Sequence, residues 1–268
     1  MRVFFIALLI FGIQGCGIDP NPQDRYTYLS SRNFQNKKVY YSFEQGFAVV
    51  EGDIIVSEKQ NITENRVPSN SQLHFGVSIT GKNRLWPDAE IPYVISDETS
   101  HSKQIKYAID HIQELTPIRL VERTTQSNYV SFEKVESGCF SSVGRIGGKQ
   151  TIGLSSKCSQ GSIIHEIGHA IGLWHEQSRE DREDFVKIHW ENIEKDKVSN
   201  FNQHINDGDD VGEYDLRSIM HYGPFAFSKN QKPTLTTKNG KTEGFGFRGG
   251  LSEGDIATIN ALYPDTNQ

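Results

Sequence analysis

Four residues between positions 165 and 175 have the types and spacing of a catalytic metal site: His165, Glu166, His169 and His175. If the stretch begins as a helix, His165 and His169 point to one side, because residues four apart share a helix face. A continued helix would turn His175 away from both. We therefore expect the helix to end before it, and Gly172 can end it because glycine adopts left-handed backbone at little cost.

Three neutral histidines leave one position of a tetrahedral Zn²⁺ ion for water, which is the arrangement of catalytic zinc sites. Zinc lowers the pKa of such a water to about 7, and a nearby carboxylate can take its proton as the water attacks a carbonyl group. The sequence thus predicts one zinc ion per chain, held by His165, His169 and His175, with Glu166 as the general base.

The composition limits the classes of partner. The chain has 268 residues, 35% hydrophobic and 23% charged, which is typical of a globular protein. Its 28 basic and 34 acidic residues give a net charge of −6, and no block of consecutive basic residues is present. Nucleic acid binding needs a clustered cationic surface, so we expect no nucleic acid partner.

The N-terminus has the features of an export signal. Met1 and Arg2 precede a nearly unbroken apolar stretch, so residues 1–15 are predicted to be a signal peptide. Residues 13–16, Ile-Gln-Gly-Cys, resemble a bacterial lipobox, which implies a lipid on Cys16 that attaches the protein to the cell envelope membrane. The alternative is ordinary cleavage nearby, with Cys16 lost or left as a free thiol and the protein secreted.

The other two cysteines fit an exported protein. Cys139 and Cys158 lie close enough in sequence to form a disulfide in an oxidising compartment, and Cys16 is then the odd one. A lipid on Cys16 would account for it.

Strands and helices are expected to alternate as far as the histidine motif, and the sequence beyond it is rich in loops. Apolar residues with helical spacing predict a helix over 100–115, capped by Ser100 or Ser102 and ended by Pro117. Residues 39–56 contain at least one strand. Further strands are expected at 91–95, 118–121, 129–135 and 151–154, and a last helix at 252–262, where Ser252 and Asp255 can form a capping box.

A second motif lies downstream, where residues 218–222 read Ser-Ile-Met-His-Tyr and Met220 is one of only two methionines. Together with the histidine motif at 165–176, this run resembles the astacins, a branch of the metzincin zinc endopeptidases. The similarity covers about residues 77–264. Further matching segments are 85–87, 91–93, 138–145, 176–182 and 251–263.

The resemblance implies an α+β fold with a two-lobed catalytic domain. The upper lobe would hold a twisted, mostly parallel five-stranded sheet and two long helices, and the loop-rich lower lobe would end in a helix. Met220 would form a turn below the zinc, and Tyr222 would lie near the metal, where it can ligate zinc and swing away to stabilise the oxyanion. An extended peptide substrate could add to the exposed sheet edge near residues 141–144. The second disulfide usual in astacins has no cysteines here, and Pro117 occupies one of its positions.

Residues 50–54, Val-Glu-Gly-Asp-Ile, resemble the astacin propeptide motif, in which an aspartate occupies the open zinc position. Asp53 would then be the inhibitory ligand. Residues 16–76 would be a tether and pro-segment, and cleavage near 75–77 would release a peptidase domain over 77–268. The alternative is an ordinary Gly-Asp turn between strands.

Glu176, next to the third histidine, is most simply a solvated surface glutamate. The family implies a different role, in which the mature N-terminus inserts into the protein and meets this carboxylate. A buried carboxylate is costly to leave unpaired, so such a contact would stabilise the mature form.

The predicted function is zinc-dependent hydrolysis of peptide bonds in extracellular or envelope proteins by a monomeric enzyme. Two other functions stay open: an adhesin or binding module that keeps zinc without turnover, and a cell-wall peptide hydrolase. Glu166 argues against the first, because a binding module needs no general base. The substrate side chains depend on loops, for which the sequence makes no prediction.

Overall fold

The computed structural model describes residues 26–31, 34–58, 84–203 and 209–264. The predicted signal peptide, Cys16 and the expected cleavage region at 75–77 lie outside these ranges. Within them, no helix is long and apolar enough to cross a membrane.

The upper lobe is built on a five-stranded sheet in the order β7-β6-β8-β10-β9. Neighbouring strands run parallel except for the edge strand β9, which is antiparallel to β10. This confirms the expected mostly parallel sheet, and each predicted strand is present within two residues of its predicted bounds. The strands are β6 (Glu90–Ile95), β7 (Arg119–Glu122), β8 (Tyr129–Lys134), β9 (Cys139–Phe140) and β10 (Lys149–Leu154).

Two long helices pack together beneath this sheet, α1 (Ser102–Leu115) and α2 (Gln160–Ile171). The buried face of α1 consists of apolar residues at helical spacing: Ile105, Ala108, Ile109 and Ile112. The expected cap was wrong. The N-cap is His101 and no side chain caps the helix, while the Thr99 hydroxyl accepts from the backbone N–H of His101. The end at Thr116 agrees with the prediction, because that residue is extended before Pro117.

One apolar core joins the sheet and both helices to parts of the lower lobe, including Met220, Leu251 and Ile259. The last helix, α3 (Glu253–Leu262), starts with the expected capping box of Ser252 and Asp255. The rest of the lower lobe has little regular structure. It contains β11 (Val186–Ile188), β12 (Leu235–Thr237) and short 3₁₀ helices at Glu176–Ser178, Arg182–Asp184, Trp190–Asn192 and Lys195–Phe201, and a further 3₁₀ turn, Pro87–Ala89, precedes β6.

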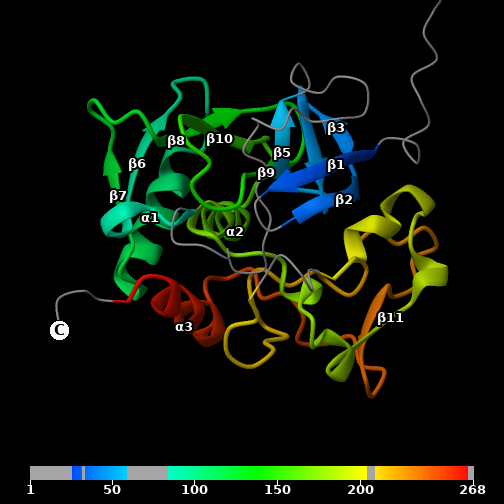
Figure 1. Ribbon diagram of the computed structural model, residues 1–268. Helices are drawn as coiled ribbons and strands as arrows, with labels where there is room; N and C mark the ends of the chain where they lie inside the picture. Colours follow the sequence, from blue (N-terminus) through cyan, green and yellow to red (C-terminus); the bar gives the residue numbers. More distant parts are fainter. Residues whose placement is uncertain (1–25, 32–33, 59–83, 204–208, 265–268) are drawn as a thin grey trace, which may run out of the picture.

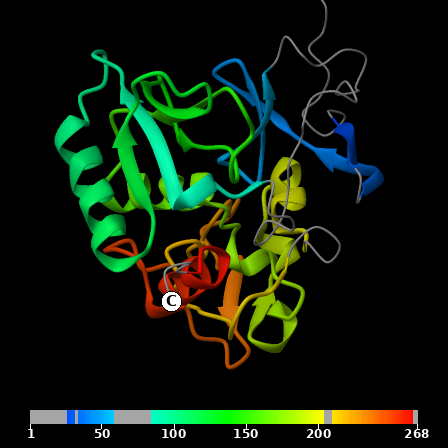
Figure 2. The same cartoon turned by 60° about the vertical axis from the view of Figure 1, so that its left-hand side comes forward.

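The residues ahead of the peptidase-like part, 26–58, are called the leading segment here. They form a hairpin of β1 (Tyr26–Ser31) and β2 (Phe34–Tyr40) and a three-stranded sheet of β3 (Ser42–Glu44), β4 (Phe47–Val50) and β5 (Ile54–Glu58). In both views the leading segment, in blue, lies at the opposite end of the molecule from α1 (Figures 1 and 2).

The leading segment pairs with the chain just beyond β9. Ile55 donates its N–H to the carbonyl of Ser141 (2.8 Å), and Ser141 donates to the carbonyl of Asp53 (2.9 Å). Apolar side chains of β3–β5 also pack on Val143 and Trp174. The sheet edge expected to receive a substrate is therefore covered by residues of the same chain.

The predicted disulfide is present. Cys139 on β9 is joined to Cys158, just before α2, with 6.0 Å between the Cα atoms. It ties the sheet edge to the start of the helix that carries the first two histidines.

Candidate metal centre

The helix α2 presents His165 and His169 as the spacing predicts, and it ends where expected. The Ser159 hydroxyl caps its start by accepting from the Ser162 N–H. At its end Gly172 adopts φ 128°, a backbone conformation that side-chain-bearing residues rarely adopt. The chain then turns back, which brings His175 to the other two rings.

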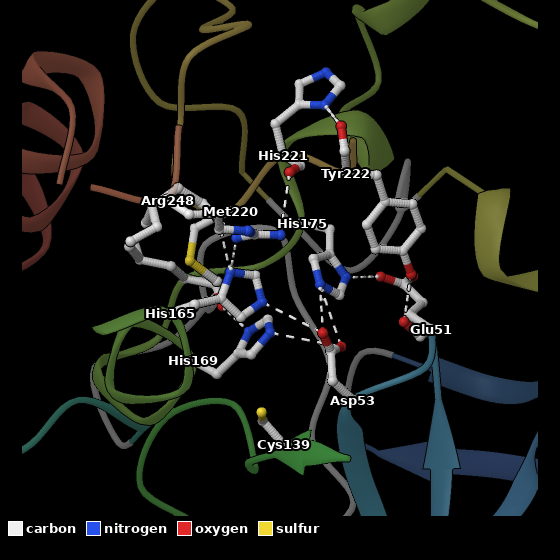
Figure 3. A network of polar contacts seen from close by, with 12 residues as sticks. Glu51, Asp53, Cys139, His165, His169, His175, Met220, His221, Tyr222 and Arg248 are labelled. Atoms are coloured by element: carbon white, nitrogen blue, oxygen red, sulfur yellow. Dashed lines mark hydrogen bonds and ion pairs between the residues drawn. The ribbon is translucent and has the colours of Figure 1, made fainter. Parts of the chain in front are cut away.

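Three histidines and one carboxylate converge at a single point (Figure 3). The Asp53 carboxylate oxygens lie 3.2 Å from His175 Nε2, 3.3 Å from His165 Nε2 and 3.8 Å from His169 Nε2. Atoms that bind a tetrahedral zinc at about 2.0–2.1 Å are separated from one another by about 3.3 Å. Two of the three distances match this separation, and the four ligand atoms all lie within 4.8 Å of one another, which is compact enough for one ion.

Three of the same four side chains carry buried polar atoms that have no hydrogen-bond partner among the described residues. His165 Nε2, His169 Nε2 and Asp53 Oδ1 are buried with no hydrogen-bond partner among the described residues. Buried nitrogen and oxygen atoms are rarely left unsatisfied, so converging lone pairs of this kind fit a cation. Three imidazoles and a carboxylate suit zinc, and the site fits one zinc ion.

Each ring is oriented by a hydrogen bond from its other nitrogen. His165 Nδ1 lies 2.8 Å from the Ile219 carbonyl and His169 Nδ1 lies 2.8 Å from the Leu173 carbonyl. His175 Nδ1 lies 2.9 Å from the carboxylate of Glu51. A ring that donates from Nδ1 keeps the Nε2 lone pair free for a metal.

The electrostatic surroundings of the three rings differ. Burial and then the Arg248 guanidinium lower the pKa of His165 to about 4. Burial, with the two neighbouring histidines, also holds the pKa of His169 well below its usual range. Burial acts in the same direction on His175, but the carboxylates of Asp53 and Glu51 outweigh it and raise its pKa to about 9.

Glu166 lies in the same buried region. Its Oε2 has no partner among the residues that the structure describes, and the side chain is almost fully buried. Burial and then the Asp53 charge hold the pKa of the Glu166 carboxyl well above its usual range. A carboxyl group of this kind is suited to exchange a proton with a reacting molecule.

Met220 lies directly under α2, as the resemblance implies. A Cβ atom on Gly168 would come within 2.9 Å of Met220 Sδ, so a larger residue there would force the buried methionine side chain to shift. The turn is fixed by Asp255, which accepts from Ser218 Oγ (2.6 Å) and from the Ile219 N–H (2.9 Å). The predicted Met-turn is therefore anchored to the start of α3.

The ring of Tyr222 lies beside His175, with 4.6 Å between ring centroids. Its hydroxyl donates to the backbone carbonyl of Glu51 in a short hydrogen bond. In this structure the leading segment holds that hydroxyl.

Glu176 is largely buried, so the simple interpretation of a solvated glutamate was wrong. Its side chain is 16% exposed, and Oε1 accepts from the Asp215 N–H (2.8 Å) and lies 3.6 Å from Arg179 Nη1. Burial raises the pKa of Glu176 to about 8, although the Asp215 N–H and Arg179 oppose it.

Two contributors were missed by the sequence analysis. Glu51 touches His175 from the leading segment, and Arg248 donates to the Ile219 carbonyl that also contacts His165. The only sequence signal for Glu51 was its position two residues before Asp53. Arg248 lies 83 residues from His165, and no local pattern connects the two.

Comparison with known proteins places this chain. Residues 78–264 match the family model of Astacin, a peptidase family. The zinc metalloproteinase nas-13 of Caenorhabditis elegans is 41% identical over 225 residues, and the solved structure of High choriolytic enzyme 1, a hatching enzyme zinc-protease from Oryzias latipes, superposes with a TM-score of 0.65 at 36% identity. The chain therefore belongs to the astacin family, and residues 78–264 form its astacin-type zinc peptidase domain.

The shared lengths differ between these relatives. The match with nas-13 covers 80% of this chain and 49% of nas-13. The match with the hatching enzyme structure covers 70% of this chain and 98% of the hatching enzyme chain. Bone morphogenetic protein 1 of Xenopus laevis, 39% identical over 196 residues, is matched over 28% of its length.

Proposed function

We propose that this protein is a zinc-dependent endopeptidase made as a latent precursor. The observation that carries the proposal is the convergence of His165, His169 and His175 with the Asp53 carboxylate, at the spacing of zinc ligands and beside the buried Glu166. Zinc, when bound there, supplies a Lewis acid that makes water acidic enough to lose a proton near neutral pH.

The chain's own groups would carry the proton transfers. Glu166, buried directly after the ligand His165, accepts the proton of the attacking water and passes it to the leaving amine. Tyr222, once released from the Glu51 carbonyl, has a hydroxyl that can donate to the oxyanion of the tetrahedral intermediate.

The leading segment is the inhibitory part of the precursor. Asp53 takes the fourth ligand position, and the pairing of Ile55 with Ser141 occupies the edge where an extended peptide substrate would add. We infer that residues 16–76 are removed by a cut near 75–77 and that 77–268 is the active form.

The new N-terminus created by that cut is proposed to meet Glu176. In support, Glu176 is largely buried with a raised pKa, which an ammonium group would lower. A cavity of about 830 Å³ lined in part by Asp215, Arg217 and Gly254 adjoins the loop that contacts Glu176 and offers a path for an inserted chain end.

Export is part of the proposal. The Cys139–Cys158 disulfide suits an oxidising compartment. Cys16 is proposed as the lipid attachment site that holds a monomeric precursor at a bacterial envelope, with secretion as the alternative.

Two other functions are kept as alternatives: a zinc-containing adhesin without turnover, and a hydrolase of cell-wall peptides. A protein substrate is favoured because the covered edge accepts an extended chain through backbone hydrogen bonds, which do not depend on side chains.

The test is zinc-dependent cleavage of casein by the activated protein, compared with its Glu166→Ala variant. We expect the variant to keep its zinc and lose activity by about 10²–10⁴-fold, the contribution of general acid–base catalysis. Equal activity in both proteins would reject the mechanism. Activity on cell-wall peptides alone would favour the second alternative.

A further inference from the structure

Glu51 lies at the tip of the β4–β5 hairpin and is almost completely buried, with 4% of its surface exposed. Its Oε2 atom lies 2.9 Å from His175 Nδ1 and accepts from Ser178 Oγ at 3.3 Å. Neither contact involves the point where Asp53 and the three Nε2 atoms converge, so Glu51 acts on a different part of the site.

The three rings differ in what orients them. His165 and His169 donate to carbonyls of Ile219 and Leu173, which belong to the peptidase domain and stay after activation. His175 alone among the three is oriented by a residue of the leading segment, which would leave. A carboxylate partner raises the basicity of a ligating imidazole and fixes its orientation.

The backbone of Glu51 makes a second contact. Its carbonyl accepts from the Tyr222 hydroxyl, and the residue has φ 50°, a left-handed conformation that is unfavourable for a non-glycine residue. An unfavourable backbone conformation persists only where surrounding contacts hold it. For Glu51 these contacts include the carboxylate with His175 and the carbonyl with Tyr222.

We propose that Glu51 is a second attachment point of the leading segment, which orients His175 through the carboxylate and holds Tyr222 through the carbonyl. The inference rests on the proposed function and adds to the role of Asp53. It follows that the precursor holds its metal more firmly than the fourth ligand alone explains. Activation would remove the hydrogen bond that orients His175 at the same time as it frees the position of Asp53.

The test measures zinc release to a chromogenic chelator from the full-length uncleaved chain. All variants carry Glu166→Ala so that self-cleavage cannot alter the sample. Glu51→Met keeps the side-chain volume without an acceptor, and Glu51→Gln keeps one acceptor oxygen. We expect Glu51→Met to release zinc about 10- to 100-fold faster than the parent, the usual effect of removing a partner of a ligating histidine, and Glu51→Gln to stay close to the parent.

Glu58→Met is the matched control, because Glu58 is an exposed carboxylate at the end of β5 in the same sheet. It should release zinc at the parent rate. Equal rates for Glu51→Met and the parent would overturn the proposal. So would a Glu51→Gln variant that releases zinc as fast as Glu51→Met, because the hydrogen bond would then not be the cause.

A second comparison needs no change at Glu51, in case those variants fail to fold. The Asp53→Ala precursor lacks the fourth ligand but keeps Glu51, whereas the cleaved chain lacks both. We expect the Asp53→Ala precursor to release zinc at least about tenfold more slowly than the cleaved chain. Equal rates would contradict the inference. Casein cleavage by the activated parent reports separately on the proposed peptidase function.

Discussion

The histidine side of the metal centre is contained in residues 165–175, whereas the carboxylate side comes from Glu51 and Asp53, which contact His175 across 124 and 122 residues of sequence. The histidine side rests on one helix, one glycine turn and carbonyls of the peptidase domain. The carboxylate side rests on a hairpin that pairs with Ser141 and packs on Val143 and Trp174. In the proposed activation the histidine side would remain, and the carboxylate side would leave with the leading segment.

The largest effect on zinc binding and activity is expected when a ligand is removed from the histidine side. His175→Ala should lose most of the bound zinc and with it the activity, because two imidazoles do not maintain a tetrahedral site. Zinc content by atomic absorption measures the effect in the activated protein, which no longer contains Asp53. His189→Ala, which removes an imidazole that contacts Thr236 in the lower lobe, is the control and should keep its zinc.

A change on the carboxylate side should raise the activity of the precursor, whereas the loss of a histidine lowers activity. Asp53→Ala opens the fourth ligand position, so the uncleaved chain should gain activity on a fluorogenic peptide, on the order of tenfold or more, the change that about 1.4 kcal/mol produces. The activated enzyme should be unaltered, because the residue has been cleaved off. If the variant precursor binds zinc but is as inactive as the parent precursor, Asp53 is not the inhibitory ligand.

A smaller effect should follow from the glycine beside Asp53. Gly52 has φ 86°, and a Cβ atom there would lie 2.6 Å from the ring tip of Phe227, which is itself packed against Tyr222. Gly52→Ala should weaken the hold of the leading segment by about 1 kcal/mol, a factor of about 5 in precursor activity.

The matched control for that change is Gly46→Ala. Gly46 has φ 89° and no atom within 4 Å of its added Cβ, so it tests backbone strain without the steric contact. The same rise in precursor activity in both variants would mean that Phe227 has no part in holding the segment.

The smallest expected effect is on stability and concerns α1, the helix that packs against the histidine-bearing helix α2. The imidazole of His111 on α1 accepts from the Leu251 N–H through Nε2 (3.0 Å), which joins α1 to the chain before α3. Burial lowers the pKa of His111 from 6.5, against the opposing charge of Glu114. The unfolded chain therefore takes up the proton first as pH falls, so this contribution is complete above pH 6.5 and is lost at lower pH.

His111→Gln keeps an acceptor but does not titrate. As the pH falls below 6.5, the parent should lose more of its free energy of unfolding than the variant, by at most about 1 kcal/mol, the size of one hydrogen bond. Urea denaturation at a series of pH values measures the difference. Parallel pH profiles for the two proteins would contradict the assignment.

The features that the sequence predicted well depend on neighbours along the chain. The i, i+4 spacing of His165 and His169 and the helix-ending role of Gly172 are local geometry, and both are found as expected. The capping box of Ser252 and Asp255 spans four residues and was equally readable. The strand positions followed from β-branched and aromatic runs.

The features that were missed depend on contacts between distant parts of the chain. Arg248 reaches the Ile219 carbonyl, and Glu51 reaches His175, only because separate elements pack together. The start of α1 was misjudged for a related reason. Serines were available for a cap, but His101 takes the position and its N–H is satisfied by Thr99. Propensity is a weak guide where tertiary packing decides.

Asp255 connects the last helix to the metal site. Its carboxylate, in the first turn of α3, holds the N–H of Ile219, and the carbonyl of that residue holds the ring of His165. Opening of α3 would therefore disturb a metal ligand, and by thermodynamic reciprocity a bound metal must oppose that opening. Amide hydrogens of α3, a helix that supplies no ligand, should exchange with solvent more slowly in the zinc-loaded protein than in the apoprotein.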